Sequence, residues 1–199
     1  MKIAIVGLFP ADPSNIVGGV EATTLRLCEG LSRSPGVEID VVVSSPEQKT
    51  GTRRIAPNWT VRSVGSFDRF GNVLLGLPDR RRMVRALRRL GPDIVHAHSA
   101  DRHALAALDS GLPAVVSIHG VIEEETRLER RPMERLRGLF RNRMVGDVLR
   151  RARNVIYVSP YLKERYDARL ARARRWGVEN PVAPVFFASR GGEGPRRVL

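Results

Sequence analysis

The chain has 199 residues and a hydrophobic fraction of 42%, which suits one sizeable core, and no apolar run approaches the ~18 residues of a membrane span or the pattern of a signal leader. Cys28 is the only cysteine, which excludes an internal disulfide and predicts a cytoplasmic protein in a reducing compartment. The formal net charge of +13 attracts phosphate polyanions, but aromatic residues make up only 6% of the chain, too few for the stacking surfaces of single-stranded nucleic acid, so we expect no nucleic-acid partner.

Short apolar runs bounded by turn residues predict six strands. These strands are 3–8, 39–43, 60–64, 93–97, 113–118 and 155–158. The first is a continuous apolar run, as expected of a strand covered on both faces in a parallel sheet. Residues 47–58 are polar and contain Gly51 and Pro57, so we expect an exposed loop before the third strand.

Apolar side chains at helical spacing predict helices between the strands. The expected helices are 20–31, 79–90, 101–110, 133–151 and one that Pro160 opens. Their predicted inward faces comprise Val20, Thr24, Leu27, Cys28 and Leu31 in the first, Met83, Val84, Leu87 and Leu90 in the second, and Met133, Leu136, Phe140, Met144, Val148 and Ala152 in the fourth. The charged stretch 123–131 is expected to be mobile and solvated.

Of the 34 basic residues only three are Lys, and the arginines are spread over several predicted helices, with clusters at 80–89 and 135–151. Two interpretations stay open. The arginines form ordinary solvated faces, or they give a weak, salt-sensitive association with an anionic membrane or a lipid-linked substrate, peripheral on the inner face of the membrane.

Six strands alternating with helices predict an α/β fold: a doubly wound parallel sheet, Rossmann-like, in three α/β/α layers. Ligands of such sheets bind outside the carboxyl ends of the strands. The residues at those ends are Phe9 and the Gly18-Gly19 loop, Ser44-Ser45, His98-Ser99, His119-Gly120 and Ser159-Pro160. Small and polar residues therefore gather at one edge of the sheet.

Several common sites of this architecture are missing from the sequence. No Gly-x-Gly-x-x-Gly follows the first strand, no Gly-Lys-Ser or Gly-Lys-Thr follows Gly18-Gly19, and there is no Gly-x-Ser-x-Gly elbow. His96 and His98 lie two apart on a strand and so point to one face, but two ligands without a third do not make a metal site, and we expect no metal.

Two features at this edge suit a ligand. The paired glycines Gly18 and Gly19 let backbone approach a phosphate at a helix start, although a plain strand-to-helix turn explains them as well. His119 ends a buried strand and precedes Gly120, so a ligand can reach its ring. The roles open to His119 are hydrogen bonding to a hydroxyl or phosphate, and proton transfer near neutral pH.

Five segments, in order along the chain, together resemble a known family. They are Gly18-Gly19-Val20-Glu21, residues 93–99 (Asp-Ile-Val-His-Ala-His-Ser), 116–120 (Val-Ser-Ile-His-Gly), 158–161 (Val-Ser-Pro-Tyr) and 179–182 (Glu-Asn-Pro-Val). This set is similar to the N-terminal half of the retaining, nucleotide-sugar-dependent glycosyltransferases with the GT-B fold, the glycosyltransferase family 4-like enzymes. The resemblance covers nearly the whole chain.

The resemblance implies that this domain holds a carbohydrate or lipid-linked acceptor, while a C-terminal domain holds the nucleotide-sugar donor. It implies no cofactor and no metal, the nucleotide sugar being a co-substrate. Gly18 and Gly19 would approach the donor diphosphate, and His119 would be the catalytic contact to the transferred sugar or acceptor. The residues that would line the cleft are Glu21, His98, Ser99, Gly120, Ser159 and Tyr161. Among these, Glu21 would cap or orient the helix start and not act as a base.

The chain departs from the family pattern after the Asn-Pro-Val segment, because it stops where a second domain would begin. We expect 1–189 to be the acceptor-side domain and 190–199 a linker with the start of an absent nucleotide-sugar domain. Such a fragment would fold but not catalyse alone. The alternatives are a stand-alone Rossmann-like module that binds a carbohydrate or nucleotide, and half of a sugar-nucleotide epimerase.

Overall fold

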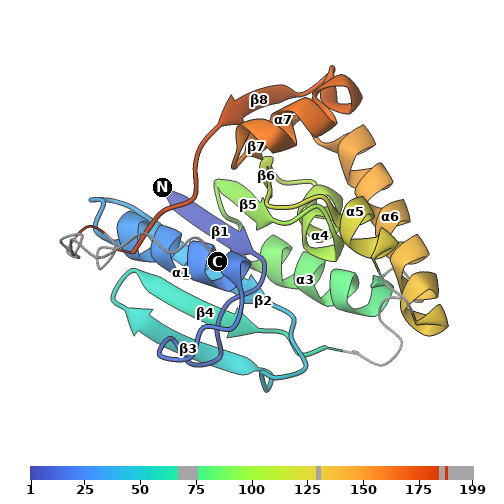
Figure 1. The fold of residues 1–199 in the computed structure, drawn as a ribbon. Coiled ribbons are helices and arrows are strands. Elements are labelled where there is room, and N and C mark those ends of the chain that lie inside the picture. Colours follow the sequence, from blue (N-terminus) through green and yellow to red (C-terminus); the bar gives the residue numbers. More distant parts are fainter. Residues whose placement is uncertain (67–75, 129–130, 184–186, 188–199) are drawn as a thin grey trace, which may run out of the picture.

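The computed structural model describes residues 1–66, 76–128, 131–183 and 187. Within them eight strands form one sheet in the order β3-β4-β2-β1-β5-β6-β7-β8 (Figure 1). The strands are β1 (Lys2–Val6), β2 (Glu38–Val43), β3 (Gly51–Ala56), β4 (Trp59–Ser63), β5 (Ile94–His98), β6 (Ala114–Ile118), β7 (Asn154–Tyr157) and β8 (Arg174–Gly177). All neighbours pair in parallel except β3 and β4.

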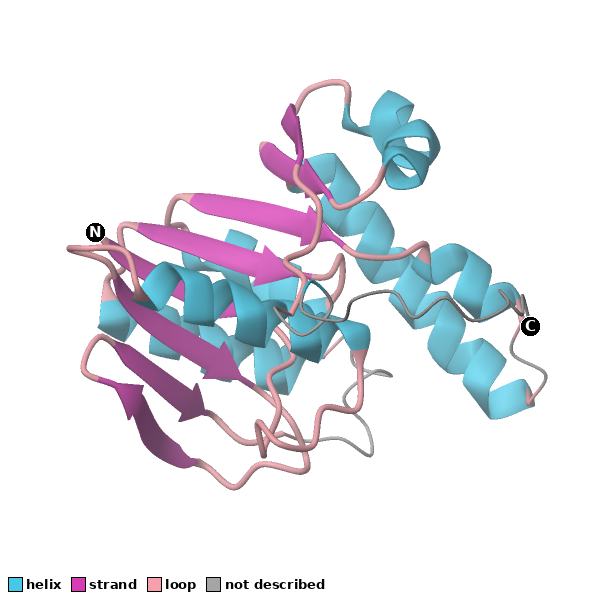
Figure 2. Cartoon of the chain, turned by 60° about the vertical axis from the view of Figure 1, so that its left-hand side comes forward, coloured by secondary structure: helices cyan, strands magenta, loops and turns pink. Residues whose placement is uncertain are grey.

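The described helices lie on both faces of the sheet (Figure 2). They are α1 (Gly19–Ser32), α3 (Leu77–Leu90), α4 (Arg102–Ser110), α5 (Ile122–Arg127), α6 (Pro132–Arg151) and α7 (Pro160–Tyr166), followed by the 3-10 helix η1 (Asp167–Leu170). The predicted α/β fold with helices on both faces of a mostly parallel sheet is confirmed.

The side chains of the central strands point alternately to the two faces of the sheet, and this divides the hydrophobic core into two clusters. On β1, Ile3 and Ile5 pack with Leu25 and Cys28 of α1. Ala4, the residue between the two isoleucines, packs in the opposite cluster with α3, α4 and α6. Because successive side chains of a strand point to opposite faces, a strand buried on both faces reads as one continuous apolar run.

The direction of winding reverses at β1. The chain passes from β1 outward to β2 on one side, and later returns to add β5, β6 and β7 on the other. The gap beyond the carboxyl ends of β1 and β5 is therefore the topological switch point, where open α/β sheets bind ligands.

The polar stretch 47–58 is not the exposed loop that its composition predicts, because residues 51–56 form β3. All side chains of β3 except Ala56 are exposed, so no apolar alternation marks the strand, and its antiparallel pairing with β4 holds it at the sheet edge. The four residues of β8 are likewise exposed and pair in parallel with β7. The prediction of six parallel strands therefore misses both edge strands.

The prediction that 123–131 is mobile and solvated is wrong for the part that the structure describes; 129–130 lie outside it. Residues 122–127 form α5. Glu123 accepts hydrogen bonds from the Tyr166 hydroxyl and, at 2.6 Å, from the Arg169 guanidinium. These contacts fix α5 against α7 and η1.

The predicted inward faces are confirmed only where a helix crosses the sheet. On α6, Met144, Val148 and Ala152 are buried, but Met133 and Leu136 are 60% and 43% exposed, because the first half of the helix runs beyond the sheet beside α5 (Figure 1). The other helices show the same split. On α1 and α3, Thr24, Cys28, Met83 and Leu87 are buried, whereas Val20, Leu27, Leu31, Val84 and Leu90 are half-buried, as is Phe140 of α6.

Candidate functional site

Three histidines meet at the carboxyl ends of β5 and β6. His119 Nε2 lies 2.9 Å from His98 Nδ1, and the two rings stack with centroids 4.9 Å apart. The His96 ring is 4.4 Å from that of His98, which confirms that the two share one face of β5, and His96 Nε2 lies 2.7 Å from Ser117 Oγ. The pairing of β5 with β6 places His98 opposite Ser117, one residue before Ile118 and two before His119.

Backbone geometry beside this cluster is tight. A Cβ built on Gly7, just after β1, would lie 3.0 Å from His98 Cβ, so glycine at this position lets β1 and the histidines approach. Ser99 has φ of 96°, the one positive value of a non-glycine residue among those described, and its N–H donates to the Ser117 carbonyl. Such strain costs about 1–3 kcal/mol and is concentrated at functional sites.

Burial keeps the three imidazoles neutral at physiological pH. It lowers the pKa of His119 to about 4 and, with help from the His119 charge, the pKa of His96 to about 4. Burial and the neighbouring histidines lower the pKa of His98 further. His119 is therefore a neutral imidazole at pH 7 and cannot donate a proton from the imidazolium form.

The unpartnered atom of His98 assigns the proton positions. His98 Nε2 is buried and has no hydrogen-bond partner. An orphaned N–H is rarer in protein interiors than an orphaned acceptor, so we place the His98 proton on Nδ1, where it donates to His119 Nε2. His119, being neutral, then carries its own proton on Nδ1. Its free side is a hydrogen-bond donor, suited to an oxygen of a ligand.

The glycine loop forms the other wall of the switch point. Gly18 is the N-cap of α1 with extended backbone, no side chain caps this helix end, and a Cβ on Gly18 or Gly19 would meet nothing within 4 Å. Among the described residues, neither a positive φ nor close packing requires glycine at these two positions. The helix start therefore presents uncapped N–H groups to open space, which is the arrangement that binds phosphate.

The sequence profile of Glycosyltransferase Family 4 matches residues 17–183. The chain belongs to this family. No curated protein gives a significant sequence match.

Solved glycosyltransferases share the fold of this family 4 chain. Sucrose-phosphate synthase from Thermosynechococcus elongatus gives a TM-score of 0.63 at 12% identity, covering 90% of this chain and 48% of that one. An alpha,alpha-trehalose-phosphate synthase (UDP-forming) from Burkholderia vietnamiensis gives 0.50 at 11% identity, covering 96% and 52%. The chain thus spans about half the length of these structures, and the predicted likeness to an N-terminal GT-B domain is confirmed.

A structural match of lower score is to an epimerase. A putative UDP-N-acetylglucosamine 2-epimerase from Listeria monocytogenes gives a TM-score of 0.44 at 11% identity, covering 94% of this chain and 70% of that one. A score this low does not help to choose between transfer and epimerisation.

The remaining predicted site residues of the family 4 domain make contacts within the fold. Glu21 accepts a hydrogen bond from the Val17 N–H at 3.2 Å and so ties the glycine loop to α1. Ser159 Oγ accepts from the Leu162 N–H and caps α7. The hydroxyl of Tyr161 donates to Glu124 of α5 at 2.6 Å, an interaction that also raises the Tyr161 pKa.

Three other strand-end residues pack within the domain. A Cβ on Gly120 would lie 3.0 Å from Glu125 Oε1, so Gly120 lies against α5. Phe9 packs edge-on against Trp59, and Ser44 donates to the Gly65 carbonyl. Of the predicted site, the structure thus brings His98, Ser99 and His119 together directly.

Sequence reasoning missed Ser117 and Gly7. Ser117 interrupts the apolar run Val115-Val116-Ser117-Ile118, and a polar residue inside a buried strand is the signal that could have pointed to it. Gly7 shows its role only through the approach of β5. Within the described ranges, no three His, Cys, Asp or Glu side chains are placed to hold a metal ion, and no helix has both the length and the apolar character to span a membrane.

Proposed function

We propose that this chain is the acceptor-side domain of a glycosyltransferase that moves a sugar, with retention, from a nucleotide sugar to a hydroxyl of a carbohydrate or lipid-linked acceptor. Family membership supports the reaction class. The observation that carries the proposal is the His98–His119 pair at the switch point, together with the uncapped glycine start of α1.

In this proposal His119 binds and orients, and does not transfer a proton. Its Nδ1–H donates to an oxygen of the transferred sugar or of the acceptor, while His98 fixes the ring through Nε2. Gly18 and Gly19 offer backbone N–H groups to the donor diphosphate, at the positive end of the α1 dipole. Ser99 and Glu21 hold the loops on either side.

The domain arrangement is part of the same proposal. In it residues 1–189 are the acceptor side, and residues 190–199, which lie outside the described part of the chain, belong to the link with a nucleotide-sugar domain, so that the cleft is complete only when both domains are present. Transfer would take place in the cytoplasm.

The test is an assay of nucleotide release by the full-length gene product with a panel of UDP-, GDP- and ADP-sugars and saccharide acceptors. We expect acceptor-dependent release of one nucleotide, with the anomeric configuration of the donor kept in the product. The absence of turnover with every donor in the panel would overturn the proposal. Conversion of the donor sugar without acceptor would indicate an epimerase, and tight nucleotide binding by residues 1–199 alone would indicate a stand-alone module.

A further inference from the structure

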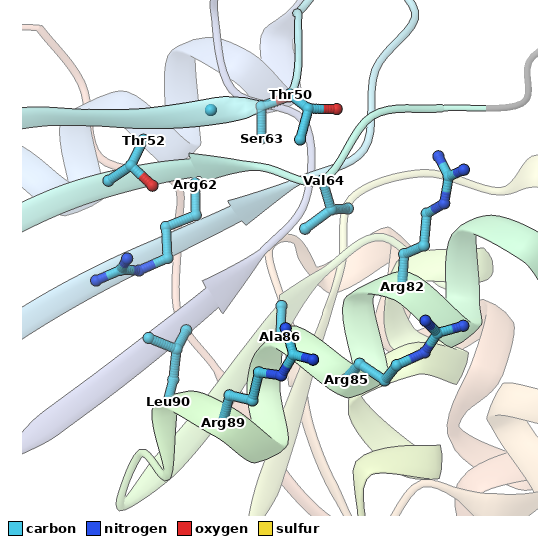
Figure 3. Close-up of a pocket in the computed structure, with 11 residues that line it drawn as sticks. Thr50, Thr52, Arg62, Ser63, Val64, Arg82, Arg85, Ala86, Arg89 and Leu90 are labelled. Atoms are coloured by element: carbon cyan, nitrogen blue, oxygen red, sulfur yellow. The ribbon is translucent and has the colours of Figure 1, made fainter.

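A pocket of about 710 Å³ lies between the β3–β4 hairpin and α3, and none of the three site histidines lines it (Figure 3). One wall comes from the hairpin and the turn before it, and the other from α3. The side chains that line it are Thr50, Thr52, Arg62, Ser63, Val64, Arg82, Arg85, Ala86, Arg89 and Leu90. Nothing in the proposed sugar transfer uses this pocket.

The charge of the pocket is one-sided. Arg82, Arg85 and Arg89 follow at i, i+3 and i+7, so α3 presents all three to the same side. No acidic residue occurs among the described lining residues, and Arg62 pairs with Asp40 outside the lining at 2.7 Å.

Arginines on the other face of α3 have partners on α4. Arg80 pairs with Asp109, and Arg88 donates to the carbonyls of Asp109 and Ser110. The arginines that face α4 therefore have partners within the protein. Arg85 and Arg89, like charges one turn apart, lie together at the pocket instead. Like charges at this spacing destabilise a helix, and an anion between them would remove that repulsion.

The rest of the lining limits the kind of anion. Guanidinium groups bind phosphate oxygens through paired, charge-assisted hydrogen bonds, and Thr50 and Thr52 carry further hydroxyl donors on the opposite wall (Figure 3). Val64 on the hairpin wall and Ala86 and Leu90 on α3 add apolar lining of the kind that packs against carbon atoms next to a phosphate. We propose that this pocket binds a phosphate-bearing ligand, with Arg85 and Arg89 holding the phosphate. The inference stands independently of sugar transfer.

The phosphate could belong to a soluble phosphomonoester or to a lipid headgroup, and two probes separate these sources. Calorimetric titration with glycerol 3-phosphate tests the first. Co-sedimentation with vesicles of phosphatidylglycerol and phosphatidylcholine tests the second, with pure phosphatidylcholine vesicles as blank. We expect saturable binding of at least one probe and, in ¹⁵N-labelled protein, amide shifts at residues 50–52 and 63–64.

The deciding variants remove two charges each. Arg85→Gln/Arg89→Gln should weaken binding about tenfold or more, because two charge-assisted contacts are lost. Arg137→Gln/Arg143→Gln, which removes two exposed arginines of α6, should stay within about twofold. Far-UV circular dichroism melts check that both variants fold; should the first not fold, the wild-type amide shifts decide.

Two results would overturn the inference. One is the absence of binding to both probes. The other is equal weakening by both double variants, or amide shifts spread over the basic surface outside the pocket, since either means attraction by net charge alone.

Discussion

His119 Nε2 and His98 Nδ1 lie 2.9 Å apart, within hydrogen-bond distance, across the ends of two neighbouring strands. The bond fixes the half-buried ring of His119 against the almost fully buried ring of His98. His119 thus lies at the switch point with a fixed ring orientation and with Nδ1–H as its free hydrogen-bond donor.

The proton positions of this pair can be observed directly. Long-range ¹H–¹⁵N correlation at neutral pH should show His98 and His119 as neutral rings protonated on Nδ1. His103 serves as an internal reference, because its Nδ1 lies 2.9 Å from Asp101 Oδ1 and must carry a proton to bond that carboxylate. A proton on His98 Nε2 would contradict the assignment and make His119 Nδ1 an acceptor.

Stability should fall on mild acidification. Burial lowers the pKa of His96 and His119 from 6.5 to about 4, so the unfolded chain takes up protons before the folded chain does. Their contribution is fully present above about pH 6.5 and is lost as pH falls toward about 4. Between about pH 7 and 5 we expect the free energy of unfolding, from urea titration, to drop by about 1–2 kcal/mol per buried histidine.

The variant His119→Gln tests whether the buried histidines cause this loss of stability in acid. It should make the drop between the two pH values smaller by about 1–2 kcal/mol, because one titrating group is removed while the amide can still bond to His98. An unchanged drop would assign the acid sensitivity to other groups.

Gly138 sets the contact between α5 and α6. A Cβ at this position would lie 2.1 Å from Thr126 Cγ2, so Gly138→Ala should lower the free energy of unfolding by about 1–3 kcal/mol through overpacking. Gly146→Ala on the same helix meets nothing within 4 Å and should raise stability by up to about 1 kcal/mol. Urea titrations measure both, and equal effects of the two would mean that α5 does not pack here as described.

The glycine loop allows a test that separates function from folding. Gly19→Ala and Gly30→Ala both place a methyl group into open space on α1, so neither should destabilise the protein. If Gly19 approaches the donor diphosphate, Gly19→Ala in the full-length enzyme should lower kcat/KM for the nucleotide sugar roughly ten- to hundredfold, and Gly30→Ala should not. Equal activities would restore the plain-turn interpretation of the loop.

The sequence by itself determined the fold class and the ends of the buried strands to within two residues. It could do so because a strand covered on both faces must be apolar throughout, and helical spacing marks the segments between such strands. It also put His96 and His98 on one face, since side chains two apart on a strand always are.

Only the tertiary structure decided the edges and the contacts. β3 and β8 have exposed side chains and exist because β4 and β7 offer backbone partners, which no local pattern records. Helical spacing on α6 could not tell that Met133 and Leu136 lie beyond the sheet. The meeting of His98 with His119 required β5 and β6 to be neighbours, because a hydrogen bond between residues 21 apart is set by strand order and not by sequence.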